Sequence, residues 1–312
     1  MVIVFSTGLG VGWFWGASLS TAAPRTVLRE SGYHYIKPVL LCNTNVNLNE
    51  NEDMAMVDKL NLYIKQKQQD DISVYFLQLL NGPRWAGVNE NDTYAPASML
   101  KVPTMVAILK YADSHDGFLS KEIYYDGSFD DNKAEYFKPA KSLQAGRYYT
   151  VDQLLTYMIG YSDNNAARLL DGAVDRQSLA NIYINLGIQL PPDTLDFMST
   201  KTYSLFLRVL FNSTYLTREM SEKALKLLTM PDFPQGIQAG VASSTEVAQK
   251  FGERQVFQPD GTLIFRELHD CGIVYTSSPY ILCVMTRGKD FSELTTVLHD
   301  VSNIVYASAA TP

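Results

Sequence analysis

Apolar and polar positions recur along this chain with two different periods, which divide it into helical and strand-like segments. Residues 54–69 carry apolar side chains at the spacing of one face of a helix. Two strand patterns follow, at residues 72–80 and 82–91, and the stretch Tyr94 to Asp113 is again helical in pattern. The middle of the chain is dominated by helical patterns, at residues 150–162, 164–174, 176–187, 200–211 and 218–230. Thr150 and Thr217 are predicted N-caps, because a hydroxyl there can accept the unpaired N–H groups of the first turn.

The last third of the chain returns to strand patterns, at residues 244–254, 263–276 and 280–288, before a final helical pattern at 291–310. The order is therefore helix, two strands, a helical block, three strands and a helix. This order predicts an α/β (α+β) fold, in which both chain ends build one antiparallel sheet flanked by helices, with an all-helical insertion. We expect a functional site in the cleft between the sheet and the helical block.

The N-terminal region differs from the rest. Residues 2–23 contain no charged residue, and at about 1.5 Å per residue they can cross a bilayer as a helix. We expect a signal peptide or membrane anchor, and hence an extracytoplasmic protein, although no Lys or Arg precedes the apolar run. The alternative is a buried core helix. Residues 24–52 are rich in Asn and predict a linker, although Tyr33 to Leu41 can pack on the domain, which we expect to span residues 53–312.

Composition excludes some functions. The chain has 312 residues, 46% of them hydrophobic, which suffices for a large core. The net charge is −7 and no basic tract is present, so nucleic-acid binding has no electrostatic support. No cofactor is implied, and we expect a monomer that acts on a small molecule or peptide.

Metal binding has no support either. There are three cysteines and no Cys-x-x-Cys pair. The four histidines, His34, His115, His269 and His299, form no His-Glu-x-x-His motif. His269 is expected to be structural. Cys271 and Cys283 either face each other across a hairpin or are buried free thiols, and Cys42 is left over.

The most suggestive short motif is Ser98-Met99-Leu100-Lys101. Residues three apart on a helix share a face, so the Lys101 amine can approach the Ser98 hydroxyl. A lysine in a dry cleft can act as a base for such a hydroxyl. Pro103 predicts an irregular or short first turn, because it cannot donate to the carbonyl four residues back. The alternative is an ordinary core helix, since this motif is common by chance.

Two further motifs change that assessment. Ser162-Asp163-Asn164 lies at the junction of two helical patterns, and Lys250-Phe251-Gly252 lies on a predicted strand. Alone, the first is explained by helix capping and the second by a strand end with a solvated lysine.

Together and in this order, the three motifs resemble those of the penicillin-recognising serine enzymes, the class A β-lactamases and penicillin-binding proteins. The resemblance extends over about residues 54–312 and includes the wider patterns "PASMLKVP", "MIGYSDNNAARLL" and "HDCGIVYTSSPYILCVMTRG".

The resemblance implies a role for each motif residue. Ser98 is the expected nucleophile and Lys101 its base or proton relay, while Ser162 passes the proton to the leaving nitrogen. The backbone N–H groups of Ser98 and Glu253 are the expected oxyanion hole.

The remaining motif residues are expected to bind substrate. Asn164 holds Lys101 and the amide side chain of the substrate. Lys250 supplies positive charge near the substrate carboxylate, and Gly252 completes the third motif.

The sequence departs from the family pattern at two places. Phe251 replaces a Thr or Ser whose hydroxyl contacts the substrate carboxylate, and Arg254 or Arg287 is a candidate to compensate. The segment between Gly187 and Ser199 contains no glutamate to activate the deacylating water. Its only carboxylates are Asp193 and Asp196, which suit turn positions beside two prolines.

These features favour a serine hydrolase that acts through a covalent acyl-enzyme on a β-lactam or a D-alanyl-type amide such as a peptidoglycan peptide. A β-lactamase is one form of this expectation. A D,D-carboxypeptidase or penicillin-binding protein with slow deacylation is another. From other classes, the alternatives are a catalytically silent module that senses cell-wall fragments, which Phe251 and the shortened segment motivate, and a structural surface protein.

Overall fold

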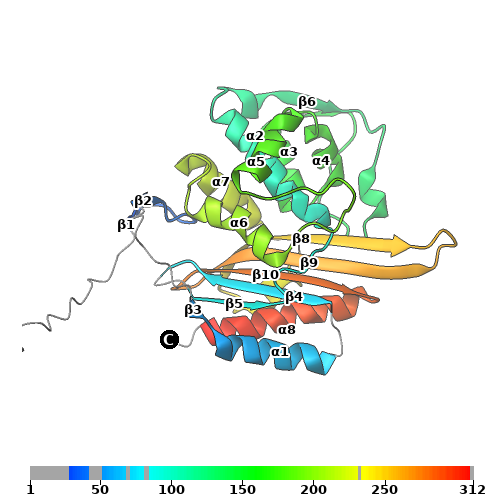
Figure 1. Ribbon diagram of the computed structural model, residues 1–312. Helices are drawn as coiled ribbons and strands as arrows, with labels where there is room; N and C mark the ends of the chain where they lie inside the picture. Colours follow the sequence, from blue (N-terminus) through cyan, green and yellow to red (C-terminus); the bar gives the residue numbers. More distant parts are fainter. Residues whose placement is uncertain (1–27, 42–50, 68–70, 81–83, 231–232, 310–312) are drawn as a thin grey trace, which may run out of the picture.

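A single six-stranded sheet forms the centre of the molecule, with helices on both of its faces (Figure 1). The computed structural model describes residues 28–41, 51–67, 71–80, 84–230 and 233–309. The strand order is β3-β5-β4-β10-β9-β8, so strands from both chain ends lie side by side, as predicted. The strands are β3 (Asn51–Glu52), β4 (Ile72–Gln78), β5 (Arg84–Val88), β8 (Glu246–Phe257), β9 (Leu263–Tyr275) and β10 (Tyr280–Gly288). All neighbours pair antiparallel except the two-residue β3, which runs parallel to β5.

The inner strands β4, β9 and β10 are buried over most of their length because both faces of the sheet are covered, and β10 accordingly has a continuous apolar run. Cys271 on β9 lies directly opposite Cys283 on β10, and the two are joined in a disulfide. Of the two alternatives for this pair, the structure therefore has the hairpin pairing. Cys42 lies outside the described residues.

One face of the sheet is covered by α1 (Met54–Lys67) and α8 (Phe291–Ala309), which pack beside each other (Figure 1). Met56, Leu60 and Ile64 recur every four residues on α1 and are buried. They meet sheet residues such as Phe76 and Leu282 in a continuous apolar layer. This face confirms the helices predicted at both chain ends.

The opposite face carries the helical block, as predicted (Figure 1). Its α-helices are α2 (Lys101–Ala112), α3 (Val151–Gly160), α4 (Asn164–Leu170), α5 (Arg176–Asn185), α6 (Thr200–Phe211) and α7 (Arg218–Leu228). Short 3-10 turns occur at η1 (Ala97–Leu100), η2 (Phe118–Ser120), η3 (Asp131–Ala134) and η4 (Ile237–Gly240). Thr150 and Thr217 are N-caps as expected, and Thr150 forms a reciprocal capping box with Gln153.

The insertion is not entirely helical, which corrects one detail of the prediction. Strands β6 (Glu122–Tyr125) and β7 (Arg147–Thr150) pair as a small antiparallel sheet. Each is four residues long, too short for an alternating pattern to be recognised. The long loop between them folds over α4 and reaches the site described below.

Part of the predicted linker, residues 28–41, is folded: the packing allowed for Tyr33 to Leu41 is present, and the linker prediction is wrong for residues 28–32. Here β1 (Leu28–Arg29) and β2 (Val39–Leu41) form a hairpin that docks on the helical block. Ile36 is fully buried, and the Lys37 N–H donates to the Phe211 carbonyl at the end of α6 at 2.9 Å. The Glu222 carboxylate on α7 accepts the backbone N–H groups of three consecutive residues, 34–36. Carbonyl and carboxylate acceptors of the domain thus satisfy donors that a free linker would present to water.

None of the helices in the described part of the chain is long and apolar enough to cross a membrane. The predicted signal or anchor at residues 2–23 lies outside the described residues.

Candidate active site

The first motif lies where η1 continues into α2. Ser98 is in the 3-10 turn, which Ala97 enters with a left-handed φ of 48°, and Lys101 begins the α-helix. This irregular start is the one expected from Pro103. The side chain of Lys101 points into the protein, where the residue is 7% exposed.

The second motif is the tight connection between α3 and α4. Ser162 has a left-handed φ of 55°, which costs free energy for a residue with a side chain. Asp163 compensates by capping α4, since its buried carboxylate accepts the Ala166 N–H at 3.0 Å and the Leu143 N–H at 2.8 Å. Asp163 is thus a capping residue, as its type suggested, while Ser162 and Asn164 are left to face Lys101.

Lys101 connects the first two motifs. Its Nζ donates to the Ser162 carbonyl oxygen at 2.6 Å, to Ser162 Oγ at 3.2 Å and to Asn164 Oδ1 at 2.6 Å. Three oxygen acceptors around one buried nitrogen hold the Lys101 side chain in one position. The predicted contact between Asn164 and Lys101 is therefore present.

The third motif adds a second lysine to the same oxygen. Lys250 is 3% exposed, and its Nζ donates to Ser162 Oγ at 2.9 Å and to the Phe251 carbonyl oxygen at 3.0 Å. The Ser162 hydroxyl oxygen thus accepts hydrogen bonds from two lysine side chains, one on α2 and one on β8. A hydroxyl that accepts two bonds keeps its own proton for a third atom.

Gly252 allows the third motif to approach the first. A Cβ at this position would lie 2.6 Å from the Pro96 carbonyl oxygen and 3.0 Å from Met99 Cγ. Only a residue without a side chain lets β8 pass this close to η1. Gly252 therefore sets the distance between Ser98 and the strand that carries Lys250 and Glu253.

Phe251 carries no hydroxyl into the site, but its ring lies against Lys250, whose Nζ is 4.2 Å from the ring centroid. The ring is buried, stacked on Phe233 with ring centroids 4.3 Å apart and packed against Phe137. The family hydroxyl at this position is thus replaced by a core side chain.

The two candidate substitutes for that hydroxyl are occupied elsewhere. Arg254 and Arg287 form ion pairs with Asp196 at 3.0 and 2.7 Å and also with the buried Glu267. These partners make the arginines a cross-strand charge network at the end of the sheet. The expectation that either one compensates for Phe251 finds no support in this geometry.

The ion pairs with Arg254 and Arg287 also hold Asp196 in place. Its two carboxylate oxygens are bound by the two arginines, and Asp193 is exposed. Neither residue lines the cavity that contains Ser98. The turn interpretation of these aspartates therefore fits the structure.

A cavity of about 520 Å³ opens between the helical block and β8, where we expected a cleft. Ser98, Lys101, Asn164 and Glu253 all line it, and so does Glu135. The predicted residues Lys250 and Gly252 lie behind this lining, on β8, and Ser162 lies between the two lysines.

Glu135 is a residue that the sequence analysis missed. It follows η3 in the loop between β6 and β7, and it accepts the Asn164 Nδ2–H at 2.5 Å. Glu253 lies nearby, and its Oε1 accepts the Phe137 N–H at 2.7 Å. Burial, together with the nearby Glu135 carboxyl, raises the pKa of Glu253 to about 7. The loop has no periodic pattern, so no sequence signal indicated its contact with Asn164.

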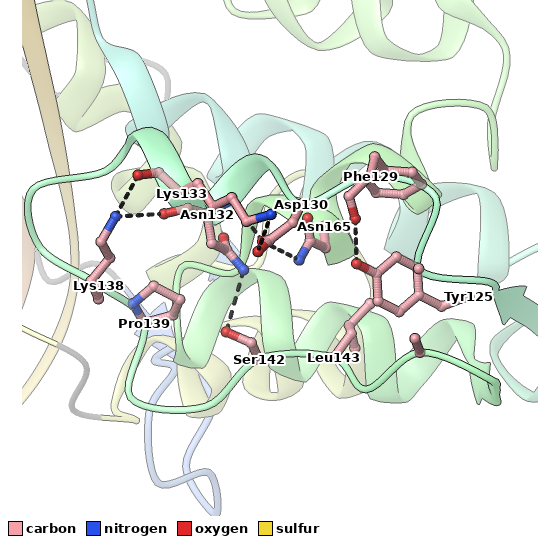
Figure 2. Close-up of a pocket in the computed structure, with 12 residues that line it drawn as sticks. Tyr125, Phe129, Asp130, Asn132, Lys133, Lys138, Pro139, Ser142, Leu143 and Asn165 are labelled. Atoms are coloured by element: carbon pink, nitrogen blue, oxygen red, sulfur yellow. Dashed lines mark hydrogen bonds and ion pairs between the residues drawn. The ribbon is translucent and has the colours of Figure 1, made fainter.

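A second cavity, of about 530 Å³, is formed mainly by the same loop (Figure 2). Asn132 connects it with the second motif: its Oδ1 accepts the Asn164 N–H at 2.8 Å, and its Nδ2 donates to Asp163 at 3.2 Å. Figure 2 shows the same amide bonded to Ser142 on the opposite wall. The loop therefore supports the position of the second motif.

His269 is structural, as expected. It is fully buried, with Nε2 3.2 Å from the Ala95 carbonyl oxygen and Nδ1 accepting the Thr286 N–H at 3.2 Å. Burial lowers its pKa to about 3, so the ring is neutral at physiological pH. Among the described residues, no group of histidine, cysteine and carboxylate side chains is placed to hold a metal ion.

Known proteins share both the sequence pattern and the fold of this chain. A sequence model of the beta-lactamase enzyme family matches residues 55–309, and no curated protein matches the chain. A mutant of PBP-A, in an acyl-enzyme complex with penicillin G, superposes with a TM-score of 0.70 at 16% identity, over 84% of this chain and 99% of that one.

Two β-lactamases are similarly close. One from Sphaerobacter thermophilus gives a TM-score of 0.68 at 17% identity, over 83% of this chain and 98% of that one. A class A β-lactamase from Mycobacterium abscessus gives 0.68 at 20% identity, over 82% and 100%. At these identities the likeness shows a shared fold, and the family match covers most of the folded domain. The chain belongs to the beta-lactamase enzyme family.

Proposed function

We propose that this protein is a serine hydrolase that forms a covalent acyl-enzyme at Ser98 with a β-lactam or a D-alanyl-type amide. The observation that carries the proposal is the Ser162 hydroxyl, which accepts hydrogen bonds from both Lys101 and Lys250 next to the cavity that contains Ser98. Three separate motifs converge there. The acyl-enzyme that PBP-A forms with penicillin G supports the same route in a protein of this fold.

In the proposed first step, Ser98 Oγ bonds to the carbonyl carbon while its proton passes to the Lys101 amine. A neutral amine keeps two N–H groups for the hydrogen bonds of 2.6 Å to the Ser162 carbonyl and Asn164 Oδ1, and leaves its lone pair for this proton. The carbonyl electrons move to the oxygen, which the backbone N–H groups of Ser98 and Glu253 stabilise. Loss of one such donor typically costs about 3 kcal/mol.

In the second step, the carbon–nitrogen bond breaks and the leaving nitrogen takes the proton of the Ser162 hydroxyl. Lys101 replaces that proton through the hydrogen bond it already makes to Ser162 Oγ. Water then attacks the ester at Ser98, releases the acid and restores the hydroxyl.

The slow step is expected to be this hydrolysis. Asp196 is held by two arginines, and the segment between Gly187 and Ser199 has no glutamate. A long-lived β-lactam adduct favours a D,D-carboxypeptidase or penicillin-binding protein over a β-lactamase. This second candidate differs from the first in the deacylation rate, not in the nucleophile.

Intact-mass spectra recorded seconds and hours after mixing with a penicillin test the proposal, beside a Ser98→Ala control. An adduct of the drug mass that requires Ser98 supports it, and its lifetime separates the two candidates. Reversible binding without any adduct, from several β-lactams and D-alanyl peptides, would instead favour a silent sensing module.

The setting of the enzyme is part of the proposal. The uncharged segment 2–23 supports export or membrane anchoring, and thus an extracytoplasmic location. We propose that the protein acts as a monomer.

A further inference from the structure

The cavity that contains Ser98 is negatively charged. Its lining includes four carboxyl groups, from Asp131, Glu135, Asp171 and Glu253. The two cationic residues of the lining are already engaged: Lys101 with the second motif, and Arg168 with Asp131 at 3.2 Å. A ligand group that fills this side of the cavity therefore meets an excess of carboxylate charge.

Glu253 is the most constrained of these groups. The residue is only 8% exposed, and its Oε2 atom is buried with no hydrogen-bond partner among the described residues. Burial is the largest cause that raises its pKa to about 7, followed by a hydrogen bond and charge repulsion with the neighbouring Glu135 carboxyl, so the two groups repel each other when both are ionised. A buried acceptor without a donor is costly, and a cationic donor relieves both costs at once.

Glu135 also fixes where the acidic groups lie relative to the reaction. Hydrogen bonds run in a row from Lys250 through Ser162, Lys101 and Asn164 to Glu135. The row is positive at one end and negative at the other. In the proposed reaction the leaving nitrogen lies at Ser162, so the acyl part of the substrate extends toward the Glu135 end.

We propose that Glu135 and Glu253 together bind a primary ammonium group on the acyl part of the substrate. The inference rests on the proposed function, because that function sets which half of the substrate faces the pair. The substrate is then an amide or ester whose acyl side chain ends in a free amine. One charge-assisted hydrogen bond in such a site raises the acylation rate roughly tenfold or more over a neutral acyl group.

Three thioesters with one leaving group, mercaptoacetate, test this at pH 8, which is above the pKa of about 7 of Glu253. Their acyl groups are 6-aminohexanoyl, heptanoyl and the monoacid adipoyl, which are similar in length and differ in charge. The rate measured is thiol release, less that of Ser98→Ala. We expect the ammonium compound to react at least about tenfold faster than the neutral one, and the carboxylate compound to react slowest.

Glu135→Gln and Glu253→Gln each keep an oxygen for the bond to Asn164 or to Phe137, and are expected to reduce this preference several-fold. Glu219→Gln, an exposed charge on α7, is the matched control and should leave it unchanged. Equal Ser98-dependent rates for all three thioesters would overturn the inference and leave the proposed function standing.

A binding measurement that needs no reaction tests the ammonium site separately from the acylation of Ser98. In Ser98→Ala, butylammonium should raise the melting temperature relative to sodium butyrate at equal ionic strength, and Glu135→Gln in that background should abolish the rise. If no thioester reacts through Ser98, the proposed function fails. If butylammonium also gives no rise, the ammonium site is refuted independently.

Discussion

Replacing Gly252 with alanine adds one methyl group at the closest approach of β8 to the nucleophile turn. The new Cβ would lie 2.6 Å from the Pro96 carbonyl oxygen and 3.2 Å from the Met99 nitrogen. Carbon and oxygen in close contact are normally about 3.3 Å or more apart, so strand and turn must separate by roughly 0.7 Å. Both contacts are backbone atoms that flank Ser98, so the strain cannot be relieved by a side-chain rotation.

This separation should lower both the stability of the protein and its rate of acylation. Forced overpacking of this kind costs about 1–3 kcal/mol of the free energy of unfolding. A misplacement approaching 1 Å at a reacting group can cost on the order of 100-fold in rate. We therefore expect Gly252→Ala to fold, with a lower melting temperature, and to acylate Ser98 roughly 10- to 100-fold more slowly than the wild type.

The assay is the rate of penicillin adduct formation by intact mass, with thermal unfolding measured on the same samples. Gly172→Ala is the matched control, because a Cβ there meets nothing within 4 Å and its φ is not in the left-handed region. The control should change stability by less than about 0.5 kcal/mol and leave the rate unchanged. A folded Gly252→Ala protein that acylates at the wild-type rate would refute the claim that this contact positions Ser98.

Three further changes test other parts of the structure. Lys101→Met should lower the acylation rate by about 10²- to 10⁴-fold, measured by adduct formation, and an unchanged rate would remove Lys101 from the mechanism. Asp270 is fully buried and its pKa is raised to about 7 by burial, so the folded protein keeps this proton while an unfolded Asp has lost it. Its contribution to the free energy of unfolding therefore falls as pH rises from about 4 to about 7, by up to roughly 4 kcal/mol. Denaturant titrations of wild type and Asp270→Asn at pH 5 and 8 should show this shift in their difference, and a constant difference would contradict it. Glu222→Gln should weaken docking of the 28–41 hairpin by about 1–3 kcal/mol, seen as faster proteolysis there, and equal cleavage rates would argue against the clamp.

Much of the fold follows from patterns that depend on local physics. The helices α1, α6, α7 and α8 each bury one continuous face, so their apolar spacing is visible in the sequence. Caps such as Thr150 follow from the unpaired N–H groups of a first turn. The pairing of strands from both chain ends was predicted from the order of helices and strands along the chain.

The errors lie where a contact depends on distant residues. The hairpin at 28–41 looks like a linker in sequence, and contacts with distant residues hold it in place, among them the acceptors that α6 and Glu222 supply for its N–H groups and the burial of Ile36. Strands β6 and β7 are stabilised by each other and carry no pattern of their own.

The residues of the site likewise include some that the sequence predicted and some that it did not. The motif residues Ser98, Lys101, Ser162 and Asn164 were identified from type and order, and the structure brings their side chains to one cavity and its wall. Glu135 was missed, because a glutamate in an aperiodic loop gives no sign that it will reach Asn164. Phe251 was recognised as a departure from the family motif. Its stacking on Phe233 could not be predicted, because the two residues are brought together only by the folded chain.

The central claim is that Ser98 is the residue acylated. Peptide mapping by tandem mass spectrometry, on protein quenched in acid seconds after addition of a penicillin, tests it most directly. The account predicts a stoichiometric adduct on the peptide that contains Ser98, fragmented to that side chain, and none in Ser98→Ala. An adduct at Ser162 or at any other side chain, with Ser98 unmodified, would contradict it.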